Sequence, residues 1–140
     1  MTETFGYGTS IELDVPFEEA RERVTVALEE EGFGVLTEID VQETLKEKLD
    51  AEFRKYTVLG ACNPMLSYRA LLTEPHIGLL LPCNVIVYEQ GCGSVVGIVD
   101  PLSMLGIVCS SGLEQVAQDA KVRLDRVLTA LNGGRQRESE

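Results

Sequence analysis

The spacing of apolar residues changes along this chain, and that change limits the folds open to it. Between Thr4 and Asp14 the apolar residues alternate with small or polar ones, which is typical of a half-buried strand. From Leu113 to Leu131 they recur every three or four positions, which is typical of one face of an α-helix. The sequence therefore predicts a fold that contains both strands and helices.

The middle of the chain repeats both patterns. Strands are predicted over Phe33 to Ile39 and Tyr56 to Ala61, and the clearest hairpin joins Asn84–Glu89 to Ser94–Val99 through a glycine turn. Ile77 to Leu81 is apolar and β-branched and favours a sixth strand, whereas Leu102 to Cys109 favours a loop with a helical turn. Apolar stripes and capping residues predict helices from Pro16 to Gly32, Asp40 to Asp50, Asn63 to Thr73 and Ser111 to Asn132.

These elements do not alternate as strand, helix, strand in the way that a parallel sheet requires. Strands joined by hairpins, with separate helices, favour the α+β class: a mostly antiparallel sheet with helices packed on one face. The chain has 140 residues, and single cores commonly hold about 100–150. We therefore expect one α+β domain over residues 1–132. Gly133 and Gly134 should end the last helix, and residues 133–140 should form a polar, disordered tail.

The charge excludes several classes of partner. The chain carries 12 Lys and Arg against 23 Asp and Glu, a net charge of −11, which opposes binding to nucleic acid and to anionic lipid. The most apolar stretch, Ile77 to Val87, is too short to span a bilayer. Because the N-terminus has no signal-peptide pattern, we expect a cytoplasmic protein whose four cysteines are thiols rather than disulfides.

Four short motifs occur in a specific order: GFGVLTEID at 32–40, LKEKL at 45–49, GACNP at 60–64 and GLLLPCNV at 78–85. Together they resemble the bacterial and archaeal family catalogued as domain of unknown function 302, and the resemblance covers Thr4 to Asn132. It implies a small α+β domain, similar in topology to the TATA-box-binding-protein-like fold, and a homodimer. It implies no established activity, and fold similarity alone does not bring DNA binding with it.

Two cysteines in these motifs are the candidate site. Cys62 precedes a predicted helix cap, Cys83 precedes a strand, and each is followed by an asparagine, Asn63 or Asn84. A helix N-terminus beside Cys62 would stabilise its thiolate and make it a nucleophile or a metal ligand. With His76, the only imidazole, the two thiols would suit a soft metal such as copper or zinc.

A structural role competes with each of these assignments. Free cysteine is among the most buried residue types, so Cys62 and Cys83 are also explained as packing or turn residues. A single histidine with no metal-binding spacing is more often a solvated loop residue, which is the competing interpretation of His76. Cys92, between two glycines, should be exposed, and Cys109 should pack beside the start of the last helix.

Three functions remain open, and the absence of any phosphate loop or catalytic triad leaves enzymatic activity undecided. The favoured function is a dimeric binding or accessory module for a small ligand, a soft metal or a partner protein. Its apolar segments, Leu79–Pro82 and Leu102–Val108, would line a pocket or a dimer seam. The alternative is a thiol-dependent redox or sulfur-handling protein in which Cys62 attacks and Cys83 resolves. The third is a structural subunit of a larger assembly.

Overall fold

The computed structural model describes the backbone of residues 2–139 and the side chains as far as residue 133. Its strands are β1 Thr2–Phe5, β2 Gly8–Leu13, β3 Gly34–Asp40, β4 Tyr56–Cys62, β5 Cys83–Gln90 and β6 Gly93–Val99. Its helices are α1 Phe17–Glu30, α2 Val41–Leu49, α3 Pro64–Thr73, α4 Pro101–Leu105 and α5 Ser111–Ser139, with the 3₁₀ helices η1 Pro75–Leu80 and η2 Gly106–Val108.

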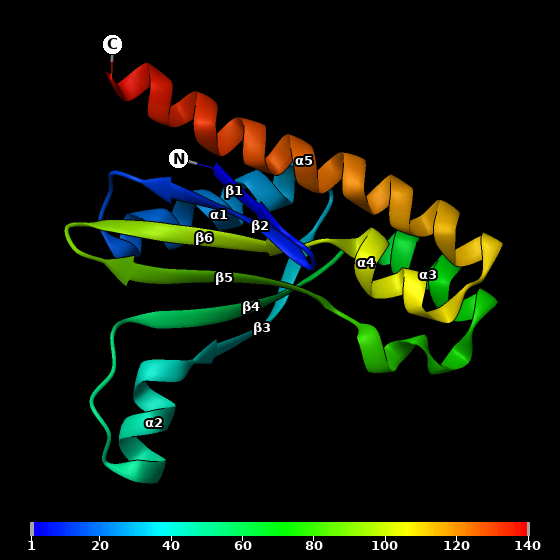
Figure 1. Ribbon diagram of the computed structural model, residues 1–140, viewed down its shortest axis with the longest axis horizontal. Helices are drawn as coiled ribbons and strands as arrows, with labels where there is room; N and C mark the ends of the chain where they lie inside the picture. Colours follow the sequence, from blue (N-terminus) through cyan, green and yellow to red (C-terminus); the bar gives the residue numbers. More distant parts are fainter. Residues whose placement is uncertain (1, 140) are drawn as a thin grey trace.

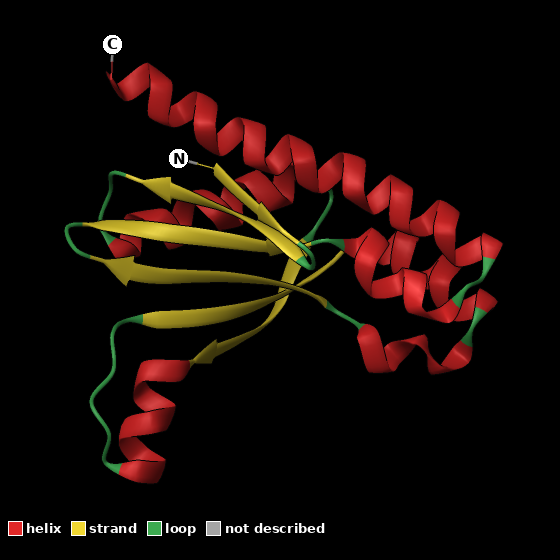
Figure 2. Ribbon diagram, in the orientation of Figure 1, coloured by secondary structure: helices red, strands yellow, loops and turns green. Residues whose placement is uncertain are grey.

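The strands form one sheet in the order β1-β2-β6-β5-β4-β3, and each neighbouring pair is antiparallel. Figure 1 shows α1 and α5 on one side of this sheet, while α2 projects from the end of β3. Figure 2 shows the remaining helices gathered at one end of the strands. The predicted α+β class, with helices on one face of an antiparallel sheet, is confirmed.

The main core lies between the sheet and the helices α1 and α5. Strand residues that alternate toward the helices are almost fully buried, as the period-two pattern predicts. From the helical side, α1 and the second half of α5 each contribute an apolar stripe. This cluster includes Ile11, Leu13, Leu59, Val85, Val87, Val96 and Ile98 from the sheet, Val24 and Leu28 from α1, and Leu124 and Val127 from α5.

A second core lies beyond the end of the sheet, among α3, η1, α4 and the first half of α5 (Figure 1). Ile77 in η1 and Leu113 in α5 have 1% and 0% of their surface exposed. The long helix α5 contributes to both cores, with Val116 and Ala120 in the second and Leu124 in the first. This helix therefore holds the helical end of the molecule against the sheet.

Two of the sequence-based strand assignments are wrong. The predicted strand from Thr4 to Asp14 is two strands, β1 and β2, joined at Gly6 and Tyr7. The alternation of apolar residues continues through this turn, so the period alone does not reveal it. The apolar segment Ile77–Leu81 lies in and directly after the 3₁₀ helix η1 instead of forming a strand, because Pro75 and the capping carboxylate of Glu74 begin a helical turn there.

The end of the last helix also differs from the prediction. The backbone of α5 continues past Gly133 and Gly134 to Ser139, whereas the sequence predicts a helix end at Asn132. The predicted disorder of residues 133–140 falls almost entirely on residues whose side chains lie outside the described part of the chain, and it stays a prediction. Each glycine costs about 1 kcal/mol of helix propensity. That cost weakens a helix but does not stop its backbone from continuing.

Three of the local capping predictions are confirmed. Asn63 accepts a hydrogen bond from the Leu66 N–H (3.2 Å), and Asp40 accepts one from the Glu43 N–H (2.9 Å). Gly32 follows α1 with a φ of +85°, in the left-handed region that glycine adopts at helix ends. Within residues 2–139, no helix has the length and apolar character needed to cross a lipid bilayer.

Candidate functional site

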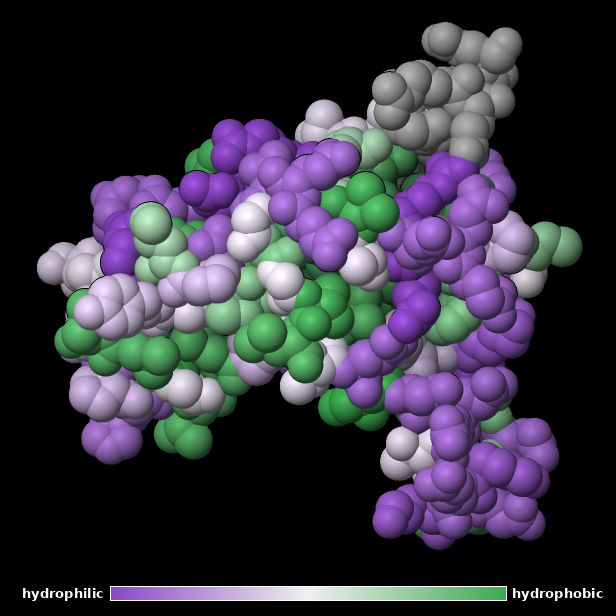
Figure 3. Space-filling view, turned by 180° about the vertical axis from the view of Figure 1, so that it is seen from behind, coloured by the Kyte–Doolittle hydropathy of each residue, from purple (hydrophilic) through white to green (hydrophobic). Residues whose placement is uncertain are grey.

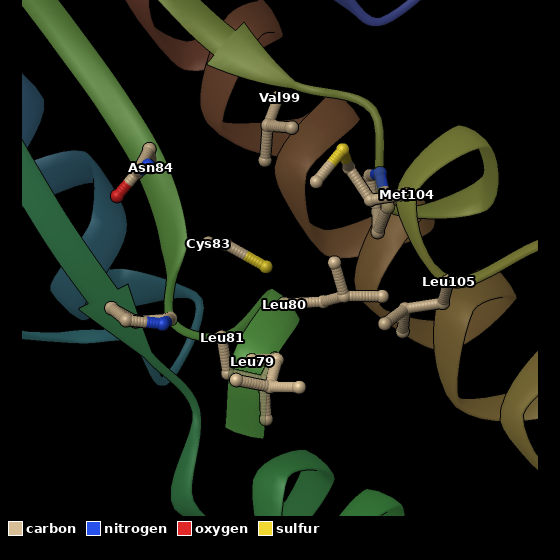
Figure 4. A pocket seen from close by; sticks show the side chains of 10 residues that line it. Leu79, Leu80, Leu81, Cys83, Asn84, Val99, Met104 and Leu105 are labelled. Atoms are coloured by element: carbon tan, nitrogen blue, oxygen red, sulfur yellow. The ribbon is translucent and has the colours of Figure 1, made fainter. Parts of the chain in front are cut away.

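A cleft of about 150 Å³ opens where the sheet meets the helical end of the molecule. One wall is the segment from Leu79 to Asn84, which links η1 to β5, and the other comes from the end of β6 and from α4. Figure 4 shows the side chains of both walls, with the Cys83 sulfur directed toward Leu80. The second wall consists of Val99, Pro101, Met104 and Leu105.

Local interactions of a few residues hold both walls in place. Asp100 accepts a hydrogen bond from the Leu102 N–H (2.9 Å) and so caps α4, whose first residue is Pro101. On the other side, Ile77 anchors η1 in the second core. Gly60 has no side chain where Pro82 approaches, since a Cβ there would lie 2.9 Å from the Pro82 Cγ. Gly60 therefore allows the chain that leads into Cys83 to lie against β4.

Cys83 is the candidate cysteine that lines the cleft, at the first residue of β5. It pairs with Ala61 of β4 in the sheet register and therefore lies on the same face as Val85. Burial raises the pKa of the Cys83 thiol to about 11, and negative charge on Cys62 adds to the rise. A thiol with this pKa stays protonated at neutral pH, which makes it a weak nucleophile.

Cys62 and Asn63 lie at the start of α3. The Cys62 Sγ is 3.1 Å from the Ser67 Oγ, at hydrogen-bonding distance, and its side chain is half-buried. Asn63 is 7% exposed, and besides capping α3 it donates a hydrogen bond to the Glu31 carbonyl at 3.5 Å. Asn63 therefore has a structural role that its hydrogen bonds explain. Cys62 lies beside the helix N-terminus, as the sequence predicted.

Asn84 and His76 have different surroundings. Figure 4 shows the Asn84 side chain pointing away from Cys83, and it is exposed. The His76 side chain is 89% exposed and lies 3.1 Å from the Glu74 carboxylate. Among the described residues, no group of three His, Cys, Asp or Glu side chains could hold a metal ion. The structure thus does not bring His76 together with Cys62 and Cys83.

The other two cysteines lie at the surface. Cys92 is exposed in the turn between β5 and β6, as predicted. Cys109 is exposed as well, so the prediction that it packs beside the last helix is wrong. It forms part of a second, wider hollow of about 400 Å³ between α4 and the start of α5. Its backbone is left-handed, with a φ of +56°, which turns the chain between η2 and α5 and leaves its side chain outside the core.

Comparison with known proteins shows which family has this architecture. The family model described as "Domain of unknown function DUF302" matches residues 9–131. The chain belongs to the DUF302 family. The crystal structure of an uncharacterized conserved DUF302 protein from Bacillus stearothermophilus is similar, with a TM-score of 0.80 and 30% sequence identity over 87% of this chain and 95% of that one. No curated protein matches the chain significantly.

Sequence reasoning anticipated part of the cleft in this DUF302 domain and missed the rest. It proposed that Leu79–Pro82 and Leu102–Val108 line a pocket or a dimer seam, and the structure brings these two segments to one cleft through Leu79, Met104 and Leu105. Val99 and the sulfur of Met104 were not singled out. The break at Asp100-Pro101 was the available signal, because it turns the chain at the end of β6 and directs α4 toward η1.

The surroundings of the cysteines predict their reactivity. In the folded protein at pH 8, we expect iodoacetamide to alkylate Cys92 and Cys109 quickly and Cys83 at least about 100-fold more slowly, since its thiolate is scarce and its side chain is only partly exposed. Peptide mass spectrometry over time measures each rate. In guanidinium chloride all four thiols should react alike. Equal rates for Cys83 and Cys92 in the folded protein would contradict the raised pKa of Cys83.

Proposed function

We propose that this DUF302 domain is a binding module whose site is the cleft between the Leu79–Asn84 segment and α4. The observation that supports it is the cleft itself, which combines apolar walls with two sulfur atoms, from Cys83 and Met104. Ligand sites in proteins are concave and mostly apolar, with a few polar groups that orient the ligand.

The volume of the cleft limits the size of what it accepts. Drug-sized ligands need roughly 300–1,000 Å³, and this cleft has about 150 Å³. An apolar cavity of ~150 Å³ is large enough for benzene. The proposed ligand is therefore a small apolar molecule, or one apolar group of a larger molecule whose remainder stays outside.

Benzene is a suitable probe for this site. We expect it to shift the NMR signals of the Met104 methyl group and of the Leu79–Leu81 methyl groups, with a dissociation constant on the order of 1 mM. Val99→Phe should fill the cleft and abolish these shifts, because Val99 is one of its lining residues.

Val122→Phe is the matched control, since Val122 is 53% exposed on α5 and does not line the cleft. This variant should bind benzene as the wild type does. If the Met104 and leucine signals do not move at saturating benzene, the cleft is not a binding site. The same conclusion follows if Val99→Phe leaves the shifts unchanged.

The thiol pair supports a second candidate function, a redox or sulfur-handling role for Cys62 and Cys83. The observation in its favour is that Cys83 pairs across the sheet with Ala61, the residue directly before Cys62, so the two thiols lie on neighbouring strands. Because Cys83 is protonated at neutral pH, Cys62 would have to be the attacking thiol. Oxidation with glutathione disulfide followed by peptide mapping tests this role: a reversible Cys62–Cys83 bond supports it, and four independent thiols contradict it.

The remaining parts of the proposal concern assembly and location. We propose a cytoplasmic homodimer, in line with the family resemblance and with the absence of disulfides among the four cysteines. A soft metal in the cleft would have to use the sulfur atoms of Cys83 and Met104, because His76 lies elsewhere.

A further inference from the structure

Helix α3 has apolar residues on two opposite faces. Leu66 and Ala70 point into the second core, with 7% and 1% of their surface exposed. On the other side, Met65, Tyr68 and Leu72 are 72%, 66% and 68% exposed. The apolar face of a helix is normally covered, whereas the described part of the chain covers only one side of α3.

Met65, Tyr68 and Leu72 form a continuous row, which we call the α3 stripe. Their spacing of three and four residues places them one above another on the helix surface. On η1, which contacts α3, Leu79 is a further apolar residue with 86% of its surface exposed. Figure 3 shows hydrophobic residues gathered at this end of the molecule, while the α2 end is hydrophilic.

The charge around the stripe identifies the partner that it fits. The chain carries a net charge of −11, so most of its surface repels a second copy. Helix α3 has no acidic residue, and its one basic residue, Arg69, pairs with Asp119 of α5 at 2.9 Å. The stripe itself is thus apolar and uncharged, and two copies can bring it together without pairing like charges within it.

We propose that the α3 stripe is the homodimer contact, packed against the same stripe of a second copy about a two-fold axis. This assignment rests on the proposed homodimer and goes beyond it by naming the surface. A two-fold interface uses the same patch on both chains, which suits a short row of large side chains. An aromatic side chain such as Tyr68 offers roughly 150–250 Å². With Met65, Leu72 and Leu79, the stripe supplies several hundred of the ~800 Å² per chain that standard interfaces bury.

The open face of the sheet is the competing surface, and it is less well suited. There Tyr56 and Tyr88 stack on each other, with ring centroids 5.4 Å apart, and Arg54 lies over the Tyr88 ring. These rings are half-buried in the single chain, so they gain less from a partner. At the edge of the sheet, Ile39 is 52% exposed and offers a test position for this alternative.

Sedimentation velocity of the full chain, at protein concentrations from roughly 1 to 100 µM, tests the proposal. We expect a wild-type dimer whose dissociation constant rises at least about 100-fold in Tyr68→Glu and in Leu72→Glu, because each variant buries two new charges per dimer. Leu49→Glu is the matched control. Leu49 is 71% exposed on α2, close to the 68% of Leu72, and this variant should remain dimeric.

Each outcome has a defined meaning. A dimer that persists in Tyr68→Glu and Leu72→Glu overturns the assignment of the stripe but leaves the homodimer standing, and loss of the dimer in Ile39→Glu then locates it at the sheet edge. A monomeric wild type at the highest concentration overturns both the stripe and the homodimer. Both stripe positions are exposed, so circular dichroism should show folded variants, and benzene binding in the cleft provides a separate readout.

Discussion

Replacing Ile77 by alanine is expected to lower the free energy of unfolding by about 3 kcal/mol, within the 2–5 kcal/mol range for buried isoleucine. Ile77 is 1% exposed and packs in the second core, so the variant leaves a cavity between η1 and α5. Denaturation in urea, followed by circular dichroism, measures this loss. Because η1 leads directly into Leu79–Leu81, benzene binding in the cleft should weaken as well.

Leu49→Ala is the control for this prediction. Leu49 is 71% exposed on α2 and belongs to neither core, so its removal should change the stability by less than about 0.5 kcal/mol. If Ile77→Ala proved as stable as the wild type, η1 would contribute nothing to the fold. The cleft wall would then lack the support that the structure gives it.

Stability should fall steeply between pH 9 and pH 11 because of Cys83. The folded protein raises the pKa of this thiol from 9.0 to about 11 through burial and the nearby charge of Cys62. Below pH 9 the thiol is protonated in the folded and the unfolded chain, so its ionisation does not lower the free energy of unfolding. Above pH 9 the unfolded chain loses this proton first, which favours unfolding. At 1.36 kcal/mol per pKa unit, the loss is about 2 kcal/mol at pH 11 and approaches about 3 kcal/mol at higher pH.

Comparison of variants isolates this effect from other groups that titrate in the same range. In urea denaturation, the free energy of unfolding of Cys83→Ala should lack the decrease that Cys83 causes between pH 9 and pH 11, whatever the stability of this variant at pH 7. Cys92→Ala, at an exposed position, should keep the wild-type slope. If wild type and Cys83→Ala fell in parallel, Cys83 would ionise as freely in the folded chain as in the unfolded one.

Local interactions explain which parts of the fold the sequence predicts. Asp40 and Asn63 bond to backbone N–H groups three residues away, so their caps can be read from neighbouring letters. The hairpin from β5 to β6 depends on a short glycine turn, which is also a local signal. By contrast, the turn between β1 and β2 sits inside an unbroken alternation, and only the pairing of Thr4 with Thr9 reveals it.

The candidate site was predictable only in part, for the same reason. The motif residues Cys83 and Leu79–Pro82 do line the cleft. Met104, from the opposite wall, is distant in the sequence and reaches the cleft because α4 packs beside η1. His76 precedes Cys83 by only seven residues, yet its side chain points into solvent beside Glu74. Closeness along the chain therefore did not predict closeness in space.

The sequence by itself determined the α+β class, the main helices and hairpin, and the presence of four thiols in an acidic chain, because periodicity, capping and charge act over a few residues. The tertiary structure alone decided which residues share a surface. It placed Cys83 half-buried in the cleft wall and raised its pKa, exposed Cys109, formed the cleft from two distant segments and left the α3 stripe uncovered by the described residues. These outcomes depend on how α5 joins two cores, and that long-range packing leaves no signature in any one stretch of sequence.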